Sequence, residues 1–528
     1  MSVRQVAGCS VLALMVFARV NCGAQGQQPA TEPPTLRVTS NLVFLDIEVL
    51  DKWGEPVVKG LSKDDFTITE DQKPQRIFSF EAPQEHAAAA KAQDDMLEGK
   101  SALTIYVLDL LNSRPEDFAF IRTSLRNYLY AQPKELREPS ELMVVGNRSL
   151  EMLQGFTRDR EELMDALKHL PPTLPYKQMN VNFMAERFAQ SIEALQEIAL
   201  QNKGVPGRKN VIWIGDGPPT VDRSQLVGSG AELVDRYMHL TTNMLVDSRV
   251  TVFAISPYLR AEGRSMATIQ GLDNGMNGNP FVGDVNFGII ASGTGGQLYF
   301  NRNNVDAEIK RAATLGANYY TLTYQPENLD PDGKLRRVKV TLRDPNLHAV
   351  TKIGYFAPEK TMNLNPREMS MVNSIDAARA GIPFTAMDVK ISGIVRHSDS
   401  HSMDFMVDLK SKALGWKPTA DGKSVTNLTV VVASLNSRRE ILASKVDRAT
   451  LAAPTQDPAK LAQEVIRFPL SVRVPRRTQS VRVVMQTEDA GRVGTADLDM
   501  KTIEAAPEAP APGEPSAPNQ TPSLTERN

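Results

Sequence analysis

Cysteine is almost absent: the 528 residues include only Cys9 and Cys22. Both lie in a stretch typical of a secretory signal peptide, in which Arg4 precedes an apolar segment at residues 6–17 and small residues end at Ala24. We expect cleavage near Ala24, which assigns residues 1–24 to the signal peptide. The mature chain would then contain no cysteine, which excludes disulfides, zinc sites with thiolate ligands and cysteine nucleophiles.

Long apolar segments and an excess of either charge are also missing. No later segment is apolar over the length that a membrane-spanning helix needs, about 20 residues. The 60 basic and 62 acidic residues nearly cancel to a net charge of −2, which gives no electrostatic case for nucleic acid or an anionic membrane. The chain is therefore expected to be secreted or periplasmic, with no membrane span and no nucleic-acid partner. A lipoprotein anchored through Cys22 is an alternative, although Asn21 fits a lipobox poorly.

Recognisable catalytic motifs are lacking as well. The chain has no His-Glu-x-x-His zinc motif and no Gly-x-Ser-x-Gly nucleophile elbow. The six histidines are scattered: His86, His169, His239, His348, His397 and His401. The sequence therefore predicts a protein that is not an enzyme and has no catalytic residues, with an unrecognised hydrolase as a third hypothesis.

The most informative stretch begins with a short apolar run at residues 103–108, typical of a strand that is covered on both faces of a parallel sheet. The run ends on Asp109, Ser113 follows, and Pro115 begins a helix. The helical period predicts that this helix buries Phe118, Ile121, Leu125 and Leu129. Asp109 should therefore lie at the carboxyl edge of an open α/β sheet, where such sheets bind ligands.

The rest of the chain divides into regions by the strand and helix patterns of its sequence. Strand and helix patterns alternate over residues 101–317, which predicts a doubly wound, mostly parallel, Rossmann-like sheet. Residues 36–83 and 318–358 contain only strand patterns, so we expect the α/β domain to be inserted in a split β-sandwich. Residues 366–504 predict a second β-sandwich-like domain. Residues 25–35 and 505–528 are rich in proline and small or polar residues and are expected to be disordered.

A family resemblance rests on the turn after the first α/β strand. The sequence Asp109-Leu110-Leu111-Asn112-Ser113 resembles the Asp-x-Ser-x-Ser motif of von Willebrand factor type A (vWA) domains, with Leu111 in place of the middle hydroxyl. The wider pattern is similar to the bacterial VWFA-related family described from acidobacteria. The supporting motifs are GFTRD at residues 155–159, GRKNVIWIGDG at 207–217, TGGQLYFN at 294–301, YYTLTYQP at 319–326 and GYFAP at 354–358.

The resemblance implies a metal-ion-dependent adhesion site (MIDAS) in a degenerate form. Asp109 and Ser113 match its first loop, and Asp216 matches the aspartate of its third loop. The threonine of the second loop has no clear counterpart, although Asn180 and Asn182 lie near the expected place. The implied ligand is one divalent cation, Mg²⁺, Mn²⁺ or Ca²⁺, held by oxygen atoms.

Three uses of this edge stay open: a functional metal site, a degenerate site without metal, and some other role. The presence of Ser113 can also be explained without a metal, because residues 113–116 match the capping-box pattern at the start of the following helix. The resemblance implies an adhesion-like protein that binds another protein of unknown identity. A metal-free structural or assembly scaffold of the cell envelope is the alternative. The oligomeric state does not follow from the sequence.

Overall fold

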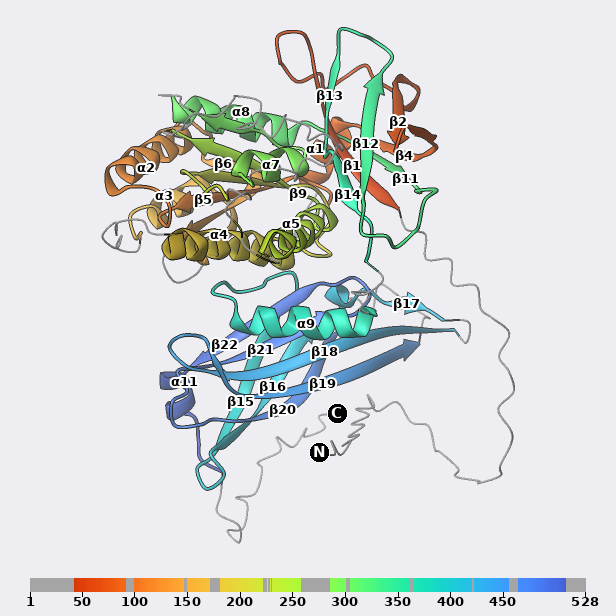
Figure 1. Ribbon diagram of the computed structural model, residues 1–528. Helices are drawn as coiled ribbons and strands as arrows, with labels where there is room; N and C mark the ends of the chain where they lie inside the picture. The colour runs from red at the N-terminus through yellow and green to blue at the C-terminus, as the bar shows by residue number, and fades with distance from the viewer. Residues whose placement is uncertain are drawn as a thin grey trace, which may run out of the picture. The chain divides into compact units, whose positions relative to one another are not determined.

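The computed structural model describes residues 42–91, 99–146, 150–170, 181–221, 226, 228, 230–257, 285–300, 304–359, 365–419, 422–454 and 464–509. These form two compact units (Figure 1). The first unit comprises residues up to 369 with 380–386 and 490–493, and the second comprises 370–379, 387–489 and the residues from 494 onward. The predicted signal peptide, the 25–35 leader and Asn180 lie outside the described residues.

A six-stranded sheet forms the centre of the α/β region, in the order β10-β9-β8-β5-β6-β7. All of its neighbouring strands pair in parallel except β6 and β7, which are antiparallel. The strands are β5 (Leu103–Asp109), β6 (Glu135–Val145), β7 (Leu150–Asp159), β8 (Lys209–Ile214), β9 (Val250–Ser256) and β10 (Leu298–Phe300). Every residue of β5, β8 and β9 is buried, as expected for parallel strands that helices cover on both faces.

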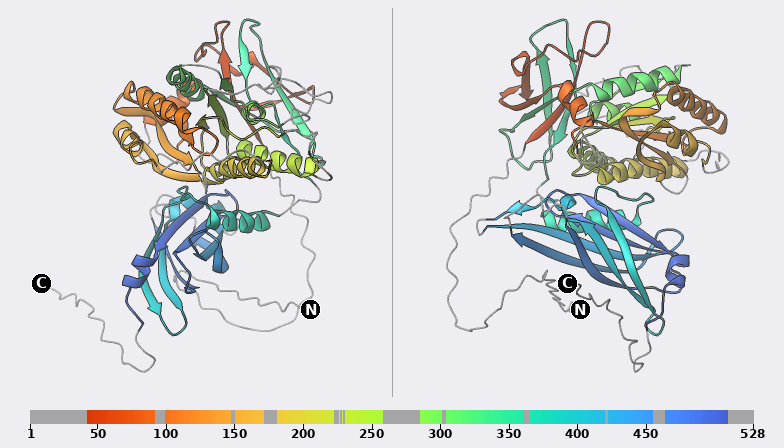
Figure 2. Two further views of the ribbon diagram at one scale, coloured as in Figure 1. Left: turned by 60° about the vertical axis from the view of Figure 1, so that its left-hand side comes forward. Right: turned by 180° about the vertical axis from the view of Figure 1, so that it is seen from behind.

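Helices lie on both sides of this sheet, with α2 and α8 on one side and α4 and α5 on the other (Figures 1 and 2). The helices in the described residues of the first unit are α1 (Pro83–Lys91), α2 (Pro115–Tyr130), α3 (Arg160–Ala166), α4 (Val181–Gln201), α5 (Gly230–Asp247), α7 (Phe287–Gly293) and α8 (Val305–Ala317). The four side chains predicted to be inward on α2 are at most 8% exposed. No helix in the described ranges has the length and apolarity to cross a membrane.

Two four-stranded sheets combine strands from before and after the α/β region. Their orders are β13-β1-β11-β4 and β14-β12-β2-β3, with antiparallel pairing of β1 with β11 and of β2 with β12. The strands are β1 (Val43–Leu50), β2 (Phe66–Glu70), β3 (Lys73–Gln75), β4 (Ile77–Glu81), β11 (Tyr320–Tyr324), β12 (Leu335–Leu342), β13 (His348–Val350) and β14 (Gly354–Phe356). That the two sheets constitute one split β-sandwich stays a prediction.

Two ion pairs join β1 to the α/β region: Glu48 with Arg208, which is buried, and Asp46 with Arg249, which is half-buried. Arg249, directly before β9, makes a two-pronged contact with Asp46, and its Nη2 lies 2.5 Å from Asp46 Oδ1. Arg208, directly before β8, places its Nη2 2.5 Å from Glu48 Oε1, and these two side chains are 1% and 2% exposed. Because Asp46 and Glu48 are two residues apart on a strand, they face the same way. Both carboxylates therefore meet the amino-terminal ends of adjacent parallel strands.

The second unit contains a three-stranded sheet, β15-β16-β20, and a sheet of order β17-β18-β21-β22 in which β19 also pairs with β18. The strands are β15 (Val389–His397), β16 (Ser402–Lys410), β17 (Lys417–Pro418), β18 (Lys423–Leu435), β19 (Ile441–Pro454), β20 (Val465–Arg473), β21 (Ser480–Thr487) and β22 (Val493–Asp499). Its helices are α9 (Pro366–Arg379) and α11 (Met500–Ala505). The predicted disordered tail from residue 505 begins too early, because Ala505 ends α11 and Glu508 forms a bridge with Arg396.

Candidate functional site

The three residues proposed from the sequence lie together at the carboxyl edge of the six-stranded sheet. Asp109 ends β5, and Asp216 follows β8, the parallel neighbour of β5. The backbone N–H of Asp216 donates to Ser113 Oγ across 3.4 Å. The expectation that strand ends bring these side chains to one edge therefore agrees with the geometry of the described residues.

Gly215 allows the loop after β5 and the loop after β8 to approach each other closely. Its φ is +142°, and a Cβ at this position would lie 2.5 Å from Asp109 Cβ and 2.7 Å from Ser113 Oγ. Any larger residue would force the loops apart, because real Cβ atoms do not approach other heavy atoms so closely. The glycine of the GDG motif thus sets the spacing of the site.

The Asp109 carboxylate is fully buried, and both of its oxygens accept hydrogen bonds from protein nitrogens. Oδ1 accepts from the backbone N–H of Asn112 at 2.9 Å and from its Nδ2 at 3.2 Å. Oδ2 accepts from Asn112 Nδ2 at 3.0 Å, Trp213 Nε1 at 3.1 Å and the backbone N–H of Gly217 at 2.8 Å. Burial raises the pKa of Asp109, and these hydrogen bonds oppose the rise. The carboxylate acts only as an acceptor in this arrangement.

Asp216 is more open to solvent than Asp109. Ser256, the last residue of β9, donates its hydroxyl to Asp216 Oδ1 at 3.0 Å. Burial raises the pKa of Asp216 to about 6, and the negative charges of Asp109 and Asp117 add to the rise. The site therefore contains a carboxylate that changes its charge near neutral pH.

The described residues do not fit a first-loop ligand set for a hard divalent cation. Such a cation needs free oxygen lone pairs, whereas four nitrogen donors already occupy the Asp109 carboxylate. Leu111, at the position of the missing hydroxyl, is buried at 1% exposure. Asn182 lies in the first turn of α4, and its side chain, like Asn180, is outside the described part. Within the described ranges, no group of three or more His, Cys, Asp or Glu side chains is placed to hold a metal ion.

The capping-box explanation of Ser113 is wrong. Helix α2 begins at Pro115 with Arg114 as its N-cap, and no side chain caps the helix. Ser113 lies one residue too early to cap it, and its hydroxyl accepts the backbone N–H of Asp216 instead. Its role in this structure is to join the first loop to the third.

Sequence patterns did not identify the residues that surround Asp109. Asn112 stands inside the vWA-like motif, and its Nδ2 also donates to Ser191 Oγ on α4 at 3.0 Å. Trp213 lies in β8 and packs edge-on against Phe287, with ring centroids 5.3 Å apart. The sequence pattern places Trp213 in a buried strand. It does not predict its hydrogen bond, because periodicity does not show which group an indole N–H contacts.

No protein-family model matches the chain, and no curated protein matches it. Among solved structures, it is similar to proximal thread matrix protein 1 from the mussel byssus, at 10% identity and a TM-score of 0.24, covering 47% of this chain and 48% of that one. Another structure of the same mussel protein gives 11% identity and a TM-score of 0.26 over 43% and 48% of the two chains. The chain thus spans about half the length of the mussel protein. It is also similar to the SpRpn10 VWA domain, at 13% identity and a TM-score of 0.22, covering 40% of this chain and 96% of that domain.

Proposed function

We propose that this chain is a secreted, non-enzymatic protein-interaction protein whose sheet edge at Ser113 and Asp216 binds a partner protein without a bridging metal ion. The observation that carries the proposal is the engagement of both Asp109 oxygens by Asn112, Trp213 and Gly217. In a metal-dependent adhesion site the ion lies between the domain and a carboxylate of the partner. Here protein hydrogen bonds to Asp109 and Ser113 already join the loops at this edge.

The chemistry of the edge favours a basic group on the partner. Asp216 is a half-buried carboxylate, and Ser256 occupies its Oδ1. Its pKa of about 6 leaves it mostly ionised at pH 7. A lysine or arginine of the partner would form a charge-assisted hydrogen bond with this carboxylate, which reverses the charge preference of a metal-bearing site.

A metal-free structural scaffold is the second candidate, and the ion pairs of β1 favour it. The pairs Asp46–Arg249 and Glu48–Arg208 join two parts of the first unit through contacts that are half-buried and buried, respectively. Such contacts restrict relative motion of the joined parts, which suits a rigid spacer. In that case the edge at Asp216 would have no partner of its own.

Site-specific photocrosslinking distinguishes the two. A photoreactive amino acid at Arg114, beside Asp216, should crosslink to one protein in the extracytoplasmic fraction of the producing cell, and EDTA should not reduce the yield. The same group at Trp53, which is 74% exposed in the turn after β1, is the control position. Equal crosslinking at both positions, or a specific crosslink that EDTA abolishes, would contradict the proposal. Amino-terminal sequencing of the secreted protein tests cleavage near Ala24.

A further inference from the structure

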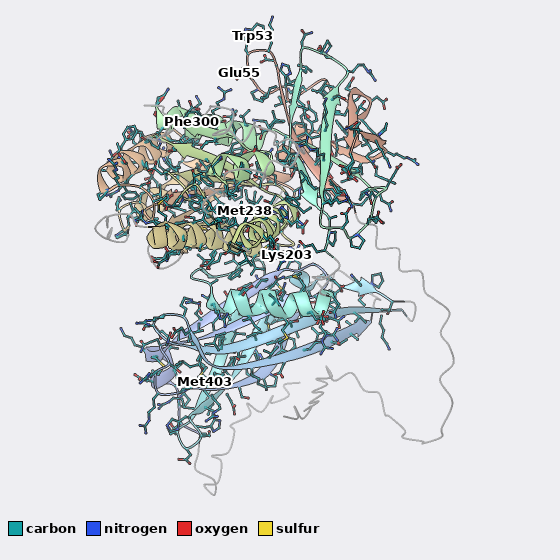
Figure 3. The ribbon with its side chains drawn as sticks, in the orientation of Figure 1. Trp53, Glu55, Lys203, Met238, Phe300 and Met403 are labelled. Carbon is teal, nitrogen blue, oxygen red and sulfur yellow. The ribbon has the colours of Figure 1, made fainter. Side chains whose placement is uncertain are left out.

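The second unit contains a polar cavity of about 390 Å³ that lies far along the chain from the vWA-like edge. Strands β15, β16 and β20 form one side of it, and β19 contributes residues 443–445. Its polar lining includes His397, Ser402, Asp404, Lys445, Ser471 and Arg473. Met403, labelled in Figure 3, marks this end of β16.

The strand register explains why so many polar groups meet here. His397, Ser402 and Arg473 are directly paired across β15, β16 and β20. Asp404 and Ser471 form the next pair on the same face, because side chains two residues apart on a strand face the same way. The residues between them, Met403 and Val472, are 0% and 5% exposed and belong to the core. The polar residues of β15, β16 and β20 therefore lie on the outer face of this sheet, and the cavity is completed by Val472 and by residues 443–445 of β19.

The lining presents both acceptors and donors at fixed positions. His397 Nε2 lies 2.8 Å from Asp404 Oδ2, which holds this carboxylate in place. The hydroxyls of Ser400 and Ser402 lie 2.6 Å apart. Ser444 and Ser471 add two further hydroxyls. A ligand with several hydroxyl groups of its own can exchange hydrogen bonds with such a lining.

The preference of the cavity for negative charge rests mainly on Arg473, because Lys445 already has a carboxylate beside it. The structure records no ion pair for the guanidinium of Arg473 within its described part, whereas Arg467 on the same strand forms a two-pronged pair with Asp408. The Nζ atom of Lys445 lies 3.0 Å from Asp447 Oδ2, and both side chains are more than 40% exposed. Arg473 is thus the cation with its hydrogen-bonding fork available to a ligand, and arginine forks match carboxylates.

We propose that this cavity binds an acidic saccharide, in which Arg473 and Lys445 contact the carboxylate of a uronic acid and the serines and Asp404 contact the sugar hydroxyls. The cavity volume of about 390 Å³ falls in the range of small-molecule sites, roughly 300–1,000 Å³. No Phe, Tyr or Trp is among the described residues that line it, so a neutral sugar would lack a large apolar ring on which to stack. The charge of the ligand therefore supplies the selectivity.

Calorimetric titration of the full chain with trigalacturonate tests the proposal. We expect saturable binding, no measurable binding of a neutral galactose trisaccharide, and much weaker binding of inorganic sulfate. Arg473→Ala should weaken trigalacturonate binding by roughly tenfold or more, because it removes a charge-assisted bidentate contact. Ser402→Ala should weaken it less. Arg473→Lys should recover part of the loss, since the charge returns without the fork.

Arg467→Ala is the matched control, because Arg467 lies on the same face of β20 and is paired with Asp408 outside the cavity. Its binding should equal that of the parent, and all variants should show the thermal unfolding profile of the parent. Absence of saturable binding, or binding that Arg473→Ala leaves unchanged, would overturn the proposal. Equal binding of the neutral trisaccharide would remove the role of charge. Sulfate that binds as tightly as trigalacturonate would show a simple oxoanion pocket instead.

Discussion

The indole N–H of Trp213 donates to Asp109 Oδ2 across 3.1 Å, from β8 to its neighbour β5. An indole nitrogen can only donate, so the Trp213 side of the carboxylate is closed to any cation. Asn112 and Gly217 occupy the remaining directions. Asp109 is thus the hydrogen-bond acceptor that connects the loops after β5 and β8.

Replacing Asp109 with asparagine should therefore destabilise the first unit. The amide would turn an N–H₂ group toward donors that now face a carboxylate oxygen, which leaves buried donors without an acceptor. We expect Asp109→Asn to lower the free energy of unfolding by roughly 2–3 kcal/mol, measured by urea denaturation with tryptophan fluorescence. Asp306→Asn, at an exposed position in the first turn of α8, is the control and should change little. A stability equal to the parent would contradict the acceptor role of Asp109.

Divalent cations should have no specific effect on this edge. Calorimetric titration of the full chain with Mg²⁺, Mn²⁺ or Ca²⁺ should show no saturable heat, and EDTA should leave the midpoint of thermal unfolding unchanged, because the Asp109 oxygens are already engaged. Saturable binding that is lost in both Asp109→Ala and Asp216→Ala, with both variants folded, would show that this edge holds an ion and would contradict the prediction.

Gly215→Ala should disrupt the edge. The added Cβ would lie 2.5 Å from Asp109 Cβ at a φ of +142°, so both sterics and backbone strain oppose it. Gly146→Ala is a matched control, since Gly146 follows β6 at the same edge, has open space where the added methyl group would lie, and has no positive φ. We expect Gly215→Ala to destabilise the unit by several kcal/mol and Gly146→Ala to be near neutral in the same denaturation assay. Similar effects of both would argue against a special role for Gly215.

Much of the fold follows from the sequence because continuous apolar runs identify buried parallel strands. Residues 103–108, the strand before Asp216 and residues 250–255 all lie in fully buried strands. Strand β7 was not predicted, and its pairing with β6 shifts register three times, so its pattern does not alternate cleanly. Helix α9 was missed because the face it buries includes Ser370, Asn373 and Ser374, which conceals the apolar period on which prediction depends.

The candidate site likewise has features that the sequence predicts and features that it does not. The approach of Asp109 to Asp216 is predictable, because both follow strands that the apolar pattern identifies. The hydrogen bonds that occupy the carboxylate oxygens of Asp109 are not predictable from the sequence. They depend on the orientation of the Trp213 and Asn112 side chains within a packed interior. The capping box suggested by Ser113 matched a sequence rule, but the helix starts one residue later than that rule requires.

Asp216 should give the first unit a pH-dependent stability. Its pKa is raised to about 6 from an ordinary value of 3.8, so between these values the folded state binds more protons than the unfolded state. Stability contributed by this group is therefore present at low pH and is lost as the pH rises through about 6. Comparing the parent with Asp216→Asn in denaturation curves from about pH 4 to 8, we expect the difference between them to change mainly between pH 3.8 and about 6 and to level off at higher pH. A pH-independent difference would contradict the raised pKa.

The ion pair of Asp46 with Arg249 gives the last prediction. Burial alone would raise the pKa of Asp46, but Arg249 beside it lowers that pKa to about 2. Arg249→Met would leave the carboxylate of Asp46, which is only 10% exposed, without its partner, and the loss should approach the about 3–5 kcal/mol typical of a broken buried pair. The double variant Asp46→Leu with Arg249→Met removes both charges and should recover most of that loss in urea denaturation. Arg343→Met is the control, because Arg343 pairs with Asp65 while it is 68% exposed, and exposed pairs contribute about 0–1 kcal/mol. If Arg249→Met costs no more than Arg343→Met, the pair does not stabilise the contact between β1 and the α/β region.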